Sequence, residues 1–185
     1  MRRHAPPGYA VMLAGLALGS IFGHRAEAQS SRDERAVRAA YVFNLVKYVE
    51  WPVPEKELVI GFTGDAATGE LMERLLAGKT SEGQTIRVVL FPSDDDLKRC
   101  RLLYVAGAET PETRKALEKV KGRGVLTVGE REGFAREGGM VGLVNSGDHI
   151  QLEVNLETAQ GEGIRISSRV LNLAQIVRPA QKGGN

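Results

Sequence analysis

Apolar residues are densest between residues 36 and 52. Apart from Arg38, Asn44 and Lys47, no strongly polar residue interrupts positions 37–49, so apolar side chains cover more than one stripe of a helix. A surface helix needs only one apolar stripe to face its core. The second stripe therefore predicts either a deeply packed core helix or a helix that also forms an interface.

Both ends of this predicted helix carry sequence signals. Ser31 and Glu34 have the spacing of a capping box, which satisfies two of the amide donors that a first turn leaves open. Pro52 disfavours the helical conformation for the residue before it, so the helix is expected to end near Val49 or Glu50.

After Pro54 the pattern alternates between strands and helices. Short runs rich in branched apolar residues predict strands, and segments with one apolar stripe predict helices. The expected strands are 58–62, 85–91, 102–105 and 125–128, and the expected helices are about 68–77 and 110–121, with an acidic loop at 94–96. This alternation is typical of crossover units with mostly parallel strands.

The pattern changes towards the C-terminus. Alternating runs at 140–145 and 149–155 flank Ser146-Gly147-Asp148 and predict an antiparallel hairpin at one side of the sheet. A short helix, a brief strand and a helix are then expected, at about 156–160, at 164–166, and from Ser167 or Ser168 to Val177. The predicted fold is α/β: a mixed, mostly parallel sheet flanked by helices in a three-layer sandwich, with a C-terminal antiparallel hairpin.

The N-terminus has the order of an export signal. A basic start is followed by an apolar run over 9–22 and by Ala26-Glu27-Ala28, which offers small residues for cleavage. The run is too short for a comfortable membrane span. We therefore expect residues 1–28 to be a cleaved signal peptide and residues 29–185 to form a single periplasmic domain.

Loss of this leader changes the charge. The full chain carries 25 basic and 23 acidic residues, and the leader holds three arginines and one glutamate, so 22 of each sign remain. A neutral mature chain gives no support for a nucleic-acid partner, which requires a concentrated basic surface.

The residue patterns predict no catalytic, metal or cofactor site. His149 is the only histidine after the leader, so neither a zinc site nor a Cys-His pair can be assembled. Gly78-Lys79-Thr80 resembles the end of a phosphate-binding loop, but it closes a predicted helix instead of opening one. Gly61, Gly64 and Gly69 lie between a strand and a helix, where a small ligand or anion is an alternative.

Cys100 is the only cysteine, which excludes an internal disulfide. Two interpretations remain open: a buried apolar thiol, or a bridge between two chains. The flanking Lys98, Arg99 and Arg101 would lower the pKa of an exposed thiol.

Three passages carry a family resemblance. They are 40–52, then 125–129 through 138–142, and 153–156 through 166–171, and the passage 76–80 fits with them. In this combination and order they resemble the YfiR-like family of periplasmic proteins, over essentially all of the mature chain.

The resemblance implies a mixed α/β sandwich, often dimeric, without enzymatic activity. The best understood member binds the periplasmic sensor region of an inner-membrane diguanylate cyclase, lowers cyclic di-GMP and restrains biofilm growth. Family domains also occur in front of sensor kinases, which makes a small-ligand-sensing module the alternative. Members commonly carry disulfide-forming cysteines, whereas this chain has Cys100 alone.

The expected partners are an inner-membrane diguanylate cyclase or sensor kinase and a second copy of the chain, with no nucleic acid and no direct membrane insertion. The candidate partner-binding residues are Tyr41, Phe43, Asn44, Lys47, Trp51, Ile166, Ser168 and Leu171. Aromatic residues of this kind anchor interfaces, but they are equally good core residues.

Overall fold

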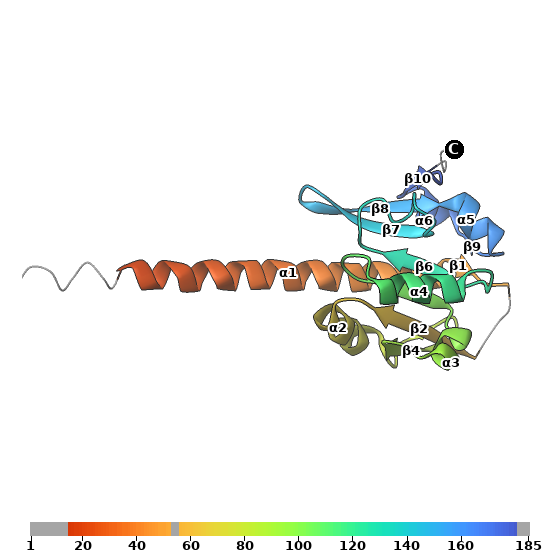
Figure 1. Ribbon diagram of the computed structural model, residues 1–185, viewed down its shortest axis with the longest axis horizontal. Helices are drawn as coiled ribbons and strands as arrows, with labels where there is room; N and C mark the ends of the chain where they lie inside the picture. The colour runs from red at the N-terminus through yellow and green to blue at the C-terminus, as the bar shows by residue number, and fades with distance from the viewer. Residues whose placement is uncertain (1–14, 53–55, 181–185) are drawn as a thin grey trace, which may run out of the picture. The chain divides into compact units, whose positions relative to one another are not determined.

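The computed structural model describes residues 15–52 and 56–180. The chain forms two compact units, residues 1–35 and 36–185. The first 14 residues of the predicted signal peptide lie outside the described residues. Every strand among the described residues belongs to the second unit (Figure 1).

Helix α1 runs from Gly15 to Lys47 without a break. The predicted start at Ser31 is therefore wrong in this chain. The amides near Ser31 have backbone carbonyls of the preceding helical turn as acceptors, so no capping box is needed there. The helix also ends earlier than expected, since Val49 and Glu50 form strand β1 (Val49–Glu50). Among the described residues, no helix has the length and apolar character needed to cross a membrane.

The described strands form an eight-stranded sheet and a two-stranded sheet. The order of the large sheet is β10-β8-β7-β6-β5-β2-β4-β3, and the small sheet pairs β1 with β9 (Figure 1). The bounds are β2 Glu57–Thr63, β3 Thr80–Ser81, β4 Gln84–Leu90, β5 Leu102–Val105, β6 Leu126–Gly129, β7 Val141–Ser146, β8 His149–Asn155, β9 Arg165–Ile166 and β10 Gln175–Val177.

The pairing confirms the predicted mixed sheet. Strands β4, β2, β5, β6 and β7 pair in parallel, and the β7–β8 hairpin is antiparallel. The short β3 pairs antiparallel with β4, and β10 runs parallel to β8 at the other edge.

Helices cover both faces of the sheet, as the three-layer prediction requires. They are α2 Ala66–Leu76, α3 Asp94–Arg99, α4 Pro111–Val120, α5 Leu156–Gly161 and α6 Ser168–Leu171. In β2, Leu58, Ile60 and Phe62 join the apolar cluster that α1, α2, α5 and α6 share. Val59, between them, joins the cluster under α3 and α4. Successive side chains of a strand point to opposite faces, so two apolar cores sandwich one sheet.

The two apolar stripes of α1 are mostly explained by this packing. Ala39, Val42, Leu45 and Val46 are buried in the core. Val37 is the one described large apolar side chain of the helix that is exposed, at 46%. The helix is therefore chiefly a core helix, and its outer stripe is narrow.

Two local predictions are wrong. Asp94–Asp96 form the first turn of α3 instead of a loop, because Ser93 and Asp96 make a capping box. The predicted helix after Ser167 ends at Leu171, and residues 175–177 form β10. Residues 175–177 are a strand because they pair with the open edge of β8. Periodicity alone does not separate short apolar helices from strands.

Candidate functional site

Four predicted partner-binding residues lie on the last turns of α1. Asn44 is exposed, whereas Tyr41, Phe43 and Lys47 are half-buried. The Tyr41 hydroxyl donates a hydrogen bond to the Ile150 carbonyl at 3.4 Å. These side chains are therefore partly anchored on the domain and partly open to solvent.

Cations cover the aromatic rings on both flanks of this helix segment. The Lys47 and Lys79 ammonium groups lie 4.0 and 5.0 Å from the centroid of the Phe43 ring. The Arg169 guanidinium lies 5.9 Å from the centroid of the Tyr48 ring. We call the surface formed by Phe43, Asn44, Lys47 and Tyr48 with Lys79 and Arg169 the α1 face.

The structure joins the other predicted segment to the end of α1. Val49 pairs with Ile166 across β1 and β9. Ile166 is buried, Leu171 is half-buried and Ser168 is exposed. Thus Ser168 extends the solvent-facing surface next to Arg169, whereas Ile166 packs in the core.

Trp51 is half-buried after β1. Its indole nitrogen donates a hydrogen bond to the Arg101 carbonyl at 2.9 Å. A buried indole N–H needs a partner, so this contact gives Trp51 a structural role in addition to any interface role.

A partly buried polar network at the carboxyl ends of β5, β6 and β7 was not predicted. Arg38 is 7% exposed and donates to the Asn145 side chain, and its Nε lies 3.8 Å from Glu130 Oε1. The same Glu130 oxygen accepts the Tyr104 hydroxyl at 2.6 Å, and its other oxygen accepts the Gly107 amide at 3.2 Å. The network ties α1 to the sheet and so positions the α1 face. The one available signal was a lone arginine in an apolar run.

A cleft of about 430 Å³ lies at the carboxyl ends of β2 and β5, where the sequence suggested a small-ligand site. Its walls include Thr63, Gly64 and Thr110, and Phe91 is exposed at its rim by 57%. Asp65 caps α2 by accepting the Thr68 amide at 2.9 Å, so this carboxylate is already engaged. The cleft is a suitable place for a small molecule in an α/β sheet.

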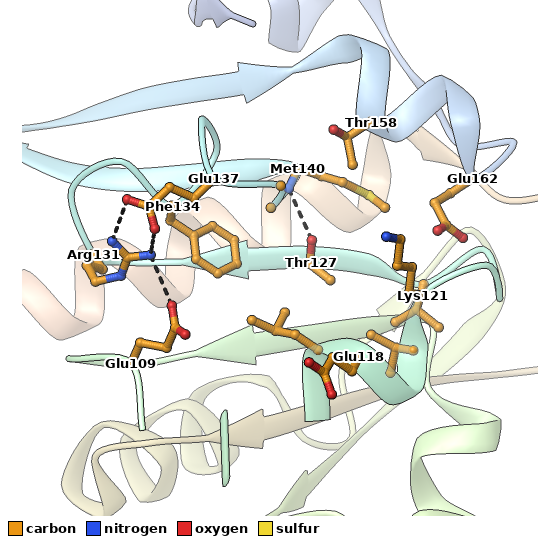
Figure 2. Close-up of a pocket in the computed structure, with 15 residues that line it drawn as sticks. Glu109, Glu118, Lys121, Thr127, Arg131, Phe134, Glu137, Met140, Thr158 and Glu162 are labelled. Carbon is orange, nitrogen blue, oxygen red and sulfur yellow. Dashed lines mark hydrogen bonds and ion pairs between the residues drawn. The ribbon is translucent and has the colours of Figure 1, made fainter. Parts of the chain in front are cut away.

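A second hollow, of about 220 Å³, lies on the face of the sheet covered by α4 (Figure 2). Leu117, Val125, Phe134 and Met140 provide its apolar lining. Figure 2 shows Arg131 with Glu109 and Glu137 at one end of the hollow, and Lys121 with Glu162 at the other.

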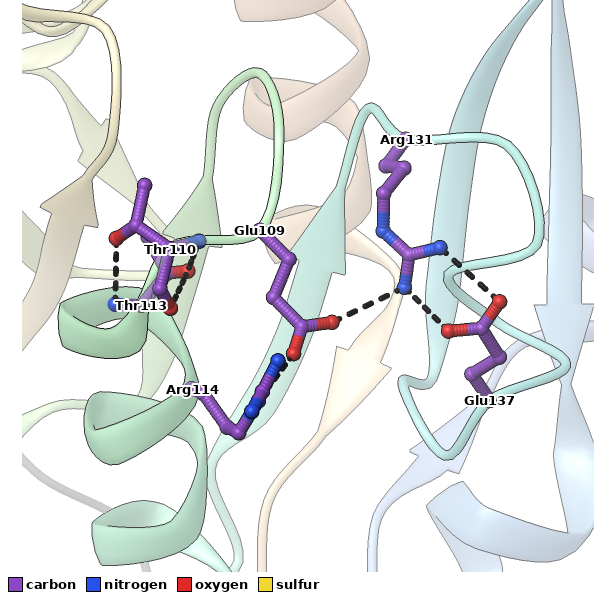
Figure 3. A network of polar contacts seen from close by, with 6 residues as sticks. All are labelled: Glu109, Thr110, Thr113, Arg114, Arg131 and Glu137. Carbon is purple, nitrogen blue, oxygen red and sulfur yellow. Dashed lines mark hydrogen bonds and ion pairs between the residues drawn. The ribbon is translucent and has the colours of Figure 1, made fainter.

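Arg131 bridges two carboxylates at the first end (Figure 3). Its guanidinium contacts Glu137 at 2.6 and 3.0 Å and Glu109 at 3.2 Å, and Glu109 also pairs with Arg114. The hydrogen bond to Glu137 and the charges of both carboxylates raise the pKa of Arg131, and Arg131 lowers the pKa of Glu137. Arg131 and Glu137 therefore stay charged at neutral pH, which suits a clamp between loops rather than proton transfer.

Two glycines in the family passages have a packing role. A Cβ at Gly139 would lie 2.2 Å from the Phe134 ring, and one at Gly129 would lie 2.5 Å from it. The ring fills the space that these glycines leave open, which anchors the 130–139 loop on the sheet.

Cys100 is 3% exposed, so the structure favours the buried thiol over a bridge between chains. Burial raises the pKa of the thiol to about 11, which keeps it protonated at neutral pH. We expect Ellman's reagent at pH 7 to label the native chain at least about a hundredfold more slowly than the urea-unfolded chain, because the thiolate is the nucleophile. Equal labelling rates would contradict the buried position.

Histidine, cysteine and acidic side chains are the possible metal ligands in the described part of the chain. No group of three histidine, cysteine, aspartate or glutamate residues there could hold a metal ion. His149 is exposed on the β7–β8 hairpin, with Nδ1 3.3 Å from Asp148.

The domain is thus an α/β sandwich whose most distinctive surface is a cation-flanked helix. The sequence matches the model of the YfiR/HmsC-like family over residues 35–175, and the chain belongs to this family. This is a family of periplasmic regulators, known as regulatory rather than catalytic, and the family implies interaction with a membrane-associated partner.

Comparison with curated proteins finds no match. Among solved structures, the chain is similar to the ABC domain in complex with L-Trp from Streptococcus pneumonia, at 13% identity and a TM-score of 0.41. The alignment covers 65% of this chain and 55% of that one, so the chain spans about half the length of that structure. A likeness at this level carries no functional argument.

Proposed function

We propose that the chain is a non-enzymatic regulator of the periplasm that binds the periplasmic sensor region of an inner-membrane diguanylate cyclase and represses cyclic di-GMP synthesis. Residues 1–28 would direct export and be removed, and residues 29–185 would act as one domain, as a homodimer. Membership of the YfiR/HmsC-like family supports this role.

The observation that carries the proposal is the α1 face. It presents half-buried Phe43 and Tyr48 rings, each with a cation over it, beside the exposed Asn44. Partly exposed aromatic residues on a rigid element are suited to anchoring a protein interface, because they lose little conformational freedom on binding. The exposed Ser168 and half-buried Leu171 would extend the contact, with Tyr41, Lys47, Trp51 and Ile166 in or beneath it.

A deletion strain tests this function. We expect cyclic di-GMP to rise when the gene is deleted and to fall again when the wild-type chain is restored, because the brake on the cyclase is lost and regained. Messenger would be measured by mass spectrometry, together with co-purification from solubilised inner membranes. The matched control is the same chain retained in the cytoplasm by deletion of residues 2–28. An unchanged messenger level in the deletion strain would contradict the proposal.

A second candidate is a small-ligand-sensing module that acts with a membrane sensor kinase. The cleft of about 430 Å³ at the strand ends favours it, because ligands of open α/β sheets settle there. A ligand that binds only the folded chain would raise its melting temperature. A thermal-shift screen of periplasmic metabolites therefore distinguishes this candidate from the first.

A further inference from the structure

We infer that the α1 face receives an acidic segment of a partner protein, whose carboxylates pair with Lys47 and Lys79 beside the Phe43 ring. This inference rests on the proposed regulatory function and names the chemistry of its partner. Its basis is the positive charge on the face and the absence, among the described residues, of carboxylates within ion-pair distance of it.

Two like charges converge on one aromatic ring. The Lys47 and Lys79 ammonium groups both lie within 5.0 Å of the Phe43 centroid. Among the described residues, no carboxylate lies within ion-pair distance of either lysine, whereas Arg87, Arg99 and Lys119 each have one. An incoming carboxylate would relieve the repulsion between the lysines and gain two charged hydrogen bonds.

Arg169, the third cation of the α1 face, also has no paired carboxylate among the described residues. It lies over Tyr48 on the other flank of the helix. The neighbouring Arg165 is paired with Glu50 at 3.3 Å. Because the mature chain is neutral overall, this concentration of unpaired positive charge is local, and it complements a negatively charged surface.

The face suits a protein better than a lipid surface. Val37 is the one described large apolar side chain of α1 that is exposed, and cations lie over both rings of the face. Insertion into a membrane needs a continuous apolar face, which this segment does not offer. The exposed Asn44, between the two flanks, can instead hydrogen-bond to a partner's side chain or backbone.

Photo-crosslinking in the living cell tests the inference. Benzoylphenylalanine would replace Asn44 in the full chain, and adducts with inner-membrane proteins would be identified by mass spectrometry. We expect the double variant Lys47→Glu/Lys79→Glu to reduce the adduct at least about tenfold, because like charges then oppose each other across the interface. Replacing the cross-linked partner's nearest Asp or Glu with Lys should restore the adduct to the double variant.

The matched control is Lys115→Glu/Lys121→Glu. Both lysines are exposed, and they lie on α4 and the turn after it, on the other layer of the sandwich. The control makes the same change in net charge and should leave the adduct unchanged. Circular dichroism must show that each variant melts within a few degrees of the wild type. If Lys47→Glu/Lys79→Glu does not fold, Lys47→Met/Lys79→Met replaces it, with the same expected loss.

Three results would overturn the inference: an adduct that persists in the double variant, an adduct with phospholipid instead of protein, or a partner whose charge swap fails to restore cross-linking. These results are distinguishable from failure of the proposed function, which the deletion strain reports separately through cyclic di-GMP.

Discussion

The substitution Gly64→Ala is expected to destabilise the domain severely. Gly64 has φ +111°, and a Cβ built there would lie 2.0 Å from the backbone oxygen of Ala106. No side-chain rotation can relieve a clash with the backbone. We expect the free energy of unfolding to fall by more than about 4 kcal/mol, a large part of a typical domain's total.

Urea denaturation followed by circular dichroism measures this loss, and Gly78→Ala is its control. Gly78 also has a positive φ, of +76°, but nothing lies within 4 Å of its missing Cβ. Gly78→Ala should lower the free energy of unfolding by about 1 kcal/mol, because it adds backbone strain but no clash. Equal losses for the two variants would show that the contact with Ala106 is not what requires glycine at position 64.

The contact at Gly64 also explains why one of the three glycines near the end of β2 is needed. The sequence left a small ligand or anion as one explanation for Gly61, Gly64 and Gly69. In the structure the Ala106 amide donates to the Thr63 carbonyl at 2.9 Å, so β2 and β5 meet closely at this turn. Close approach of two backbones explains Gly64 without any ligand.

The substitution Arg38→Met is expected to have the second largest effect. It removes the charge that faces Glu130 in a nearly buried site and leaves Asn145 without its donor. Removing one partner of a buried pair typically costs about 3–5 kcal/mol, because the other charge stays buried. The midpoint of urea unfolding at pH 7 measures this cost.

A double-mutant cycle isolates the pair. Glu130→Gln keeps the shape of the side chain, and its combination with Arg38→Met should cost less than the two single changes together. Arg74→Met is the control, since Arg74 pairs with Glu70 on the exposed face of α2 and should lose at most about 0.5 kcal/mol. If Arg38→Met costs no more than this control, the network does not hold α1 on the sheet.

Much of the fold could be predicted because its elements have strong local signals. Strand β5 has the expected bounds, and the β7–β8 hairpin forms around the predicted turn. Helix α4 runs from Pro111 to Val120, within one residue of the predicted bounds at each end. Periodicity of apolar residues also placed α2 and α4 between the parallel strands, whereas α3 was expected to be a loop.

The candidate site was predictable only in part. The sequence selected Phe43, Asn44 and Lys47 on α1 from their residue types. It offered no reason to place Lys79 over the same ring, because these residues are brought together by tertiary packing. The Arg38 network has the same origin, since its members come from α1, β5, β7 and the loop after β6.

By itself, the sequence determined the alternation of strands and helices, the hairpin, the isolated cysteine and the likeness to a family of regulators. These are local properties, recorded in short windows of the chain. Tertiary packing alone explains that both apolar stripes of α1 are largely core, that residues 175–177 join the edge of β8, and that Lys47 and Lys79 lie at the same Phe43 ring. Such outcomes depend on which surfaces meet, and contacts between distant segments leave no periodic signal in either segment alone.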